Sequence, residues 1–298
     1  MKKILVVITF IFINQLLFSQ ENSVADEEID EIIDNLITLD DDYLIDLINE
    51  FNHYQILIAS VDFNDKTYFL GRDLGLKQFN VTSQLMYKNS NGIYAGAAGA
   101  YYDKFDPKWD LTILAIGYGK YFGKLRNIKG ELGYSRYIFS DSESNDFENS
   151  IDGSFSITNK NDNYGALLDA SYLFGKRTGF QTTASFYGNI KLFDLNTSSD
   201  AKVVFVPSIS FILASENIDT SRIDRLGIDV PYINRVVNSF EEFSLRNIQL
   251  NLPLQLEFDN FLLEAGYNFN FPSAFEFERE VENTSFLNVG FTYIFDLN

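Results

Sequence analysis

The sequence predicts an all-β transmembrane protein: an antiparallel up-and-down barrel of about twelve strands, preceded by a short helical segment. Three observations lead to this fold class. The chain ends in a strand with one continuous apolar face, similar alternating segments recur along most of the sequence, and the breaks between those segments alternate in length.

The last fifteen residues, Thr284–Asn298, show the pattern most clearly. Apolar and polar residues alternate there with a period of two, which is typical of a β-strand. The apolar side reads Leu287, Val289, Phe291, Tyr293, Phe295 and Leu297. An apolar face so rich in aromatic residues, in a chain without cysteine, indicates a strand with lipid on one side and a water-filled lumen on the other.

Within this strand, the eight residues from Asn288 to Phe295 resemble the C-terminal assembly signal of bacterial outer-membrane β-barrel proteins. The residues that carry the resemblance are Asn288, Gly290, Tyr293 and Phe295. Asp296, Leu297 and Asn298 follow the final aromatic residue, where many relatives stop. The resemblance implies insertion into a Gram-negative outer membrane by the barrel assembly machinery, with membrane lipid and lipopolysaccharide as neighbours.

Alternation of the same kind recurs upstream. From Asn247 to Phe258, a complete apolar face accompanies a complete polar face over about the length that a tilted strand needs to cross the hydrocarbon. The expected strands are 54–71, 76–88, 92–103, 109–121, 126–139, 149–159, 163–175, 179–193, 200–215, 243–257, 260–270 and 284–297. A turn at residues 62–66 would add a hairpin to this set.

The gaps between these strands are alternately short and long, as in barrels that have tight periplasmic turns and long external loops. This pattern predicts that both termini are periplasmic. The longest gap, Ser215–Glu242, contains an apolar stripe at helical spacing, and we expect it either to constrict the barrel mouth or to pack on neighbouring loops. The candidate constriction residues are Leu226, Tyr232, Ile233, Val236, Val237 and Phe240.

The N-terminal region has two parts before the barrel. Residues 1–20 begin with two lysines and a short apolar run, which predicts a secretory signal peptide. Residues 21–52 are acidic with apolar residues at helical spacing, which predicts a periplasmic helical segment. This segment either rests on the barrel mouth as a solvated acidic helix, or it acts as a plug or docks a periplasmic or outer-membrane protein partner. The barrel is expected to span residues 53–298.

Composition argues against several classes of function. A formal net charge of −19 disfavours nucleic acid as a partner. The absence of cysteine removes thiolate metal sites, and Asp40, Asp41 and Asp42 lack the glycine and glutamate of a calcium loop. The single histidine, His53, argues against a catalytic triad, and we expect neither an enzyme nor a cofactor or metal site.

Charged residues on the predicted inward faces are the candidates for function. They have both signs, so they either line a water-filled passage or pair and close it. The candidate lumen-lining residues are Lys77, Lys88, Lys129, Glu131, Asp152, Asp169, Lys191, Lys202, Glu257 and Glu264. The sequence therefore predicts a porin-like channel for small solutes or ions, with slight cation preference. The alternative is a closed structural barrel within a larger outer-membrane assembly, docked through its acidic N-terminal segment.

Overall fold

The computed structural model describes residues 54–297, except 69, 74–76, 105–106, 124–125, 141–146, 162, 196–200, 216–242 and 275–280. The predicted signal peptide and acidic helical segment lie outside the described residues. The strands are β1 (Gln55–Asn64), β2 (Asn80–Asn89), β3 (Ile93–Tyr102), β4 (Trp109–Phe122), β5 (Ile128–Phe139), β6 (Phe147–Thr158), β7 (Tyr164–Gly175), β8 (Thr178–Gly188), β9 (Ile190–Asp194), β10 (Lys202–Phe205), β11 (Ser208–Ala214), β12 (Ser244–Phe258), β13 (Phe261–Pro272) and β14 (Thr284–Asp296).

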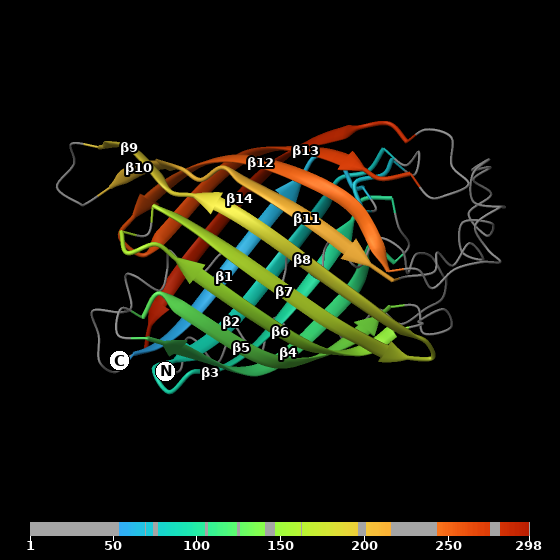
Figure 1. Ribbon diagram of the computed structural model, residues 1–298, viewed down its shortest axis with the longest axis horizontal. Coiled ribbons are helices and arrows are strands. Elements are labelled where there is room, and N and C mark those ends of the chain that lie inside the picture. Colours follow the sequence, from blue (N-terminus) through green and yellow to red (C-terminus); the bar gives the residue numbers. More distant parts are fainter. Residues whose placement is uncertain are drawn as a thin grey trace.

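These fourteen strands form a closed antiparallel barrel whose wall has twelve strand positions, which we call staves (Figure 1). Each stave pairs with its neighbours in sequence, and β14 closes the circle by pairing with β1 from Ile56↔Asp296 to Asn64↔Asn288. Closure gives every strand of the wall a partner on both sides, except the short turn-side strand β9, which pairs only with β10. The backbone hydrogen bonds of the rest of the wall are therefore satisfied between neighbouring strands, as a membrane-spanning sheet requires. The predicted up-and-down barrel of about twelve strands is confirmed.

Two of the staves are each divided into two strands. β9 continues β8 and β10 continues β11, with breaks at Asn189 and at Val206–Pro207. Proline has no N–H for the ladder, which explains the break at Pro207. Pairing continues across it, because the N–H of Gly188 donates to Pro207 O at 2.9 Å and the N–H of Val206 donates to Pro253 O at 3.1 Å.

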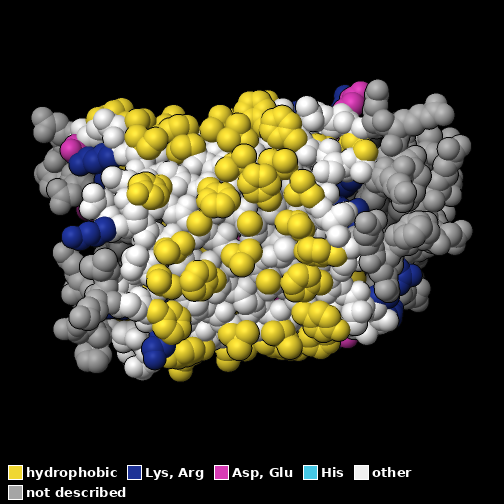
Figure 2. All heavy atoms as spheres, viewed as in Figure 1, with side chains coloured by type: hydrophobic (Ala, Val, Ile, Leu, Met, Phe, Trp, Pro, Cys, Tyr) yellow, Lys and Arg dark blue, Asp and Glu magenta, His cyan; other side chains and the backbone are white. Residues whose placement is uncertain are grey.

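The outer surface carries a broad band of apolar side chains, with Lys and Arg gathered at the two ends (Figure 2). Leu132 in β5 is the clearest case, with 64% of its surface exposed. Burial of this band in lipid supplies the driving force that a soluble protein obtains from a central core. Residues exposed on this face include Val61, Leu114, Ile116, Ile151, Leu168, Phe186, Leu254, Tyr267 and Phe291.

The inward faces are polar over much of the wall but contain two apolar clusters. One consists of Ile56, Ile58 and Met86, with Tyr54, Tyr94 and Ile294 packed against it. The other consists of Ala100, Tyr102, Leu111, Ile113, Tyr137 and Leu173. Side chains therefore fill part of the interior, which is narrower than a simple polar bore.

Glycines in β4 and β5 make room for one of these inward aromatic residues. A Cβ atom added at Gly117 would lie 2.2 Å from the Tyr94 hydroxyl, and one at Gly133 would lie 2.4 Å from it. The tyrosine ring thus lies flat along the wall over the glycines of two neighbouring strands. Glycine at these two positions therefore leaves the space that Tyr94 occupies on the inward wall.

The two ends of the barrel differ in their connections. Short turns join β2 to β3, β4 to β5, β6 to β7 and β12 to β13 at the end where both chain ends of the described barrel lie, and Leu297 N–H donates to Gln55 O there at 2.9 Å. We call this the turn side. The opposite end, the loop side, carries the longer connections, although β7 and β8 are joined there by only two residues. Within the described residues, no helix is long and apolar enough to cross a membrane.

The first strand is shorter than predicted. β1 ends at Asn64 rather than near residue 71, and the described residues between β1 and β2 form neither a continued strand nor an added hairpin. They turn into the loop-side mouth, where the contacts described below hold them. The prediction of Lys77 within a strand is wrong for the related reason that β2 begins only at Asn80, and Lys77 is exposed before it.

Candidate functional site

Most of the predicted lumen-lining residues lie on the inward side of the wall, opposite the apolar residues that face outward. Lys191 lies on the short strand β9, where every residue is exposed, and its Nζ is 2.6 Å from Asp194 Oδ1. The inward-facing members are Lys88, Lys129, Glu131, Asp152, Asp169, Lys202, Glu257 and Glu264.

Two ion pairs form on the inward wall near the turn side. Lys129 Nζ lies 3.1 Å from Glu131 Oε1, and Lys202 Nζ lies 2.7 Å from Glu257 Oε2 across the β10–β12 pair. The Glu257 side chain is only 4% exposed, so its partner offsets a carboxylate that is almost removed from solvent. Both signs therefore meet and partly neutralise each other at this end of the barrel.

Asp152 is the centre of a hydrogen-bond network across three strands. Its Oδ2 accepts hydrogen bonds from Ser135 Oγ at 2.8 Å and Ser150 Oγ at 2.9 Å, and its Oδ1 accepts one from Ser171 Oγ at 2.8 Å. The Tyr137 hydroxyl lies 2.7 Å from Ser150 Oγ and extends the network. Hydrogen bonds to an ionised acceptor are stronger than neutral ones, so this carboxylate ties β5, β6 and β7 together on the inner wall.

Replacing Asp152 with Ala is expected to lower the free energy of unfolding by about 2–3 kcal/mol, because three hydroxyl groups lose a charged acceptor at once. Urea titration of the folded barrel in detergent, followed by its heat-dependent gel mobility, measures the loss. Asp194→Ala is the matched control: this side chain is 67% exposed, and its ion pair should contribute less than about 1 kcal/mol. Equal losses in the two variants would contradict a stabilising role for the network.

A second pair of inward carboxylates lies on either side of a glycine. Asp62 and Glu264 both pair in register with Gly290, and a Cβ atom at Gly290 would lie 2.4 Å from Asp62 Oδ1. The missing side chain lets the Asp62 carboxylate lie across β14 toward β13. Gln255 Nε2 donates to Glu264 Oε2 at 2.8 Å. This stretch of the wall is acidic, and the sequence reasoning had not singled out Asp62.

The loop-side mouth is narrowed by residues 65–68 and 70–72, which we call the mouth segment. Tyr68 and Leu70 are both buried. The Tyr68 hydroxyl donates to Ser285 O at 3.2 Å, and its ring centroid lies 6.2 Å from that of Phe286, an inward residue of β14. The segment therefore rests against the inside of the barrel wall.

Further contacts fasten the mouth segment to β12, β13 and β14. Thr284 Oγ1 donates to Gly71 O at 2.6 Å, and the Arg72 guanidinium donates to Ser273 O. Gly71 has a φ of +78°, and a Cβ there would lie 2.6 Å from Asn247 Oδ1. Only glycine fits this left-handed, closely packed position. Sequence reasoning missed the segment, although Leu70-Gly71-Arg72-Asp73 shows the break in alternation that marks a turn.

The turn-side end contains a cavity of about 390 Å³. It brings together Lys88, Lys129 and Glu131 from the predicted set with Tyr54, Arg126 and further residues of β3 and β4. The remaining predicted residues do not line it; they are Lys77, Asp152, Asp169, Lys191, Lys202, Glu257 and Glu264.

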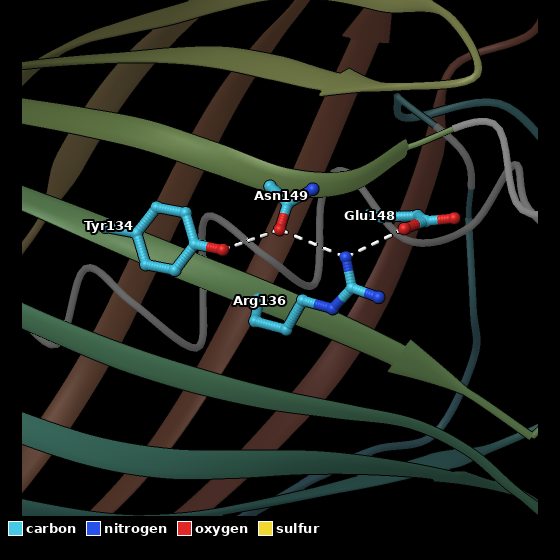
Figure 3. Close-up of polar contacts among 4 residues, drawn as sticks. All are labelled: Tyr134, Arg136, Glu148 and Asn149. Carbon is cyan, nitrogen blue, oxygen red and sulfur yellow. Dashed lines mark hydrogen bonds and ion pairs between the residues drawn. The ribbon is translucent and has the colours of Figure 1, made fainter.

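A polar cluster also lies on the outward wall near the loop side (Figure 3). Arg136 Nη1 lies 2.8 Å from Glu148 Oε2 and 3.1 Å from Asn149 Oδ1, which also accepts a 2.6 Å hydrogen bond from the Tyr134 hydroxyl. The position fits the rim of the apolar band, where charged groups reach the headgroup region.

The other predicted residues have simpler outcomes. Asn288, Gly290, Tyr293 and Phe295 all lie in β14, with Phe295 exposed on the outward face. Their role in assembly stays a prediction. Leu226, Tyr232, Ile233, Val236, Val237 and Phe240 lie outside the described residues, as does His53. Among the residues that the structure describes, no three His, Asp or Glu side chains are grouped as a metal site would require.

The sequence matches no protein-family model and no curated protein. Solved structures with a similar fold include the KdgM porin (12% identity, TM-score 0.45, 80% of this chain and 98% of that one) and LpxR from Salmonella typhimurium (9%, 0.44, 80% and 100%). The COG4313 outer membrane channel from Pseudomonas putida F1 is also similar (8%, 0.41, 82% and 95%). Identities this low transfer no residue role to this chain. Its own closed wall of twelve antiparallel staves, apolar outside and largely polar inside, makes this protein a β-barrel of the outer-membrane type.

Proposed function

We propose that this protein is a narrow porin-like passage for small solutes, with a preference for cations. The supporting observation is the order of charges along the inner wall. Lys88, Lys129 and Lys202 lie within two residues of the turn-side ends of their strands, whereas Asp152, Asp169 and Glu264 lie farther along theirs. A small cation that crosses the barrel thus passes wall carboxylates beyond the turn-side lysines, and these carboxylates attract it.

In this proposal the barrel resides in the cell outer membrane, with the turn side and both termini facing the periplasm. Tight turns at that end support this orientation, because barrels of this type place short turns in the periplasm. Membrane lipid and lipopolysaccharide surround the apolar band, and the barrel assembly machinery inserts the chain. No step requires a nucleic acid, a cofactor or an enzymatic site.

A second candidate is a closed barrel that serves as a structural subunit. The burial of Tyr102, Leu111, Ile113 and Tyr137 on the inward face favours it, since each of these side chains is at most 1% exposed. The mouth segment, which narrows the loop-side opening, also favours a closed barrel. In that case, residues 21–52 supply the acidic surface that docks a periplasmic or outer-membrane protein partner.

Planar-bilayer recording of the purified full-length protein distinguishes the two candidates. A passage gives discrete conductance steps at neutral pH, with a reversal potential in a KCl gradient that has the sign of cation preference. Asp169→Asn combined with Glu264→Gln is expected to lower the ratio of cation to anion permeability by roughly twofold or more, because two wall carboxylates lose their charge. Glu131 is left unchanged, since its removal would free Lys129 from its ion pair.

The matched control, Asp259→Asn with Glu282→Gln, removes two carboxylates outside the wall and should leave the reversal potential unchanged. A bilayer that stays silent with correctly folded protein would favour the structural subunit. Steps whose reversal potential is the same in both double variants would show that Asp169 and Glu264 do not set selectivity.

A further inference from the structure

The turn-side cavity differs in charge from the rest of the molecule. It lies between the β2–β3 turn, the end of β4 and the start of β5, and Tyr54 borders it at the entrance to β1. Its volume of about 390 Å³ is in the range of small-ligand pockets. Its lining combines basic side chains with the aromatic rings of Tyr54, Tyr94 and Tyr121.

Among the described residues, four basic side chains and one acidic side chain, that of Glu131, border this space. The basic residues are Lys88, Lys120, Arg126 and Lys129. The chain as a whole carries a formal net charge of −19, so a net positive cavity is not what a random distribution of its charges would give. Lys129 Nζ lies 3.1 Å from Glu131 Oε1, so these two charges offset each other and the cavity is positive overall. Such a concentration of cations attracts anions.

An aromatic ring holds two of these cations side by side. Arg126 Cζ lies 5.1 Å from the centre of the Tyr121 ring, and Lys129 Nζ lies 5.8 Å from it. Cation–π contacts at these distances restrict the two side chains before any ligand arrives. Burial raises the pKa of the Tyr54 hydroxyl, and the nearby charges of Lys88 and Arg126 oppose that rise. The Tyr54 hydroxyl therefore remains protonated at neutral pH as a hydrogen-bond donor at the edge of the cavity.

We propose that this cavity binds an oxyanion, a carboxylate or a phosphate group, carried on a flat apolar body. The guanidinium of Arg126 offers parallel N–H donors that match two oxygens of such a group, and the lysines add charge without demanding a fixed geometry. The rings of Tyr54, Tyr94 and Tyr121 provide apolar faces for the rest of the ligand. The proposal does not depend on whether the barrel conducts.

The test is calorimetric titration of the full-length protein in nonionic detergent with phenyl phosphate, in a buffer free of other phosphates. We expect saturable binding of one phenyl phosphate per barrel. Arg126→Gln combined with Lys129→Gln should weaken this binding at least tenfold. Glu131→Gln should strengthen it, because the variant removes the carboxylate that repels the anion and competes for Lys129.

Lys77→Gln with Lys108→Gln is the matched control, because it removes two exposed lysines at the loop side and should leave the affinity unchanged. Heat-dependent gel mobility confirms that each variant folds. The proposal is overturned if the wild-type protein shows no saturable binding, or if the cavity variants and the control bind alike. Repeating the titration in nanodiscs distinguishes the ligand's source: loss of binding in phosphatidylglycerol but not in phosphatidylcholine identifies a lipid headgroup, and unchanged binding in both identifies a soluble solute.

Discussion

Leu132→Arg is expected to lower the free energy of unfolding by about 2–4 kcal/mol, the cost of placing a cation on the lipid face of a barrel near the bilayer midplane. Leu132 lies near the middle of β5, points outward and is 64% exposed in the isolated chain. In the membrane, lipid would cover that exposed surface. Urea titration of the protein refolded into phosphatidylcholine vesicles measures the change.

Tyr164→Arg is the matched control, since Tyr164 is also 64% exposed but is the first residue of β7, at the edge of the band. There an arginine reaches the headgroups, so the expected loss is only about 0–1 kcal/mol. If both variants lost the same stability, or neither lost any, the apolar band would not be a lipid-facing surface. The comparison therefore tests both the barrel fold and the placement of its apolar band in the lipid bilayer.

The predictability of the fold follows from strand geometry. In β12, alternation from Asn247 to Phe258 fixes which side chains face lipid, because successive side chains of a strand point to opposite faces. The structure places Leu254 outward and buries Asn247 and Glu257, as that alternation requires. Register between neighbouring strands is then constrained, because a slip of one residue would turn the lipid-facing side chains of a strand toward the interior.

The interior was less predictable, for two reasons. In β4, both faces are apolar: Leu111 and Ile113 point inward, whereas Leu114 and Ile116 point outward. When both faces of a strand are apolar, the alternation of its side chains does not show which face points inward. The inward cluster around Tyr137 was therefore not predicted. Contacts such as Asp152 with three serines depend on which strands become neighbours, and that information is not local to any segment.

The mouth segment was missed because its position depends on distant residues. Its partners, Ser273, Thr284 and Ser285, are more than two hundred residues away in sequence. A local pattern therefore showed only that regular alternation stops near Leu70. It could not show that the chain turns inward rather than outward.

Replacing residues 65–72 with a glycine–serine linker of the same length is expected to raise single-channel conductance roughly threefold or more, if the barrel conducts. Tyr68, Leu70 and Arg72 are buried at the loop-side mouth. The Tyr68 hydroxyl donates to Ser285 O in β14, and the Arg72 guanidinium donates to Ser273 O just after β13. A flexible linker makes none of these contacts and has no bulky side chains, so the mouth widens where the segment now lies. Planar-bilayer recording measures the step size directly.

Gly71→Val tests whether the position of the mouth segment restricts the passage, because it leaves the length of the segment unchanged. Valine is strained at a φ of +78°, and its Cβ would meet Asn247, so the segment should leave the wall without any loss of chain. We expect a conductance rise in the same direction as with the linker. Gly123→Val is the control, because Gly123 also has a positive φ, +81°, but lies in a turn at the opposite end, where its Cβ would approach only Asn127 Oδ1, at 3.8 Å. Backbone strain alone would affect both variants equally, whereas a constriction at the mouth requires that only Gly71→Val enlarge the step.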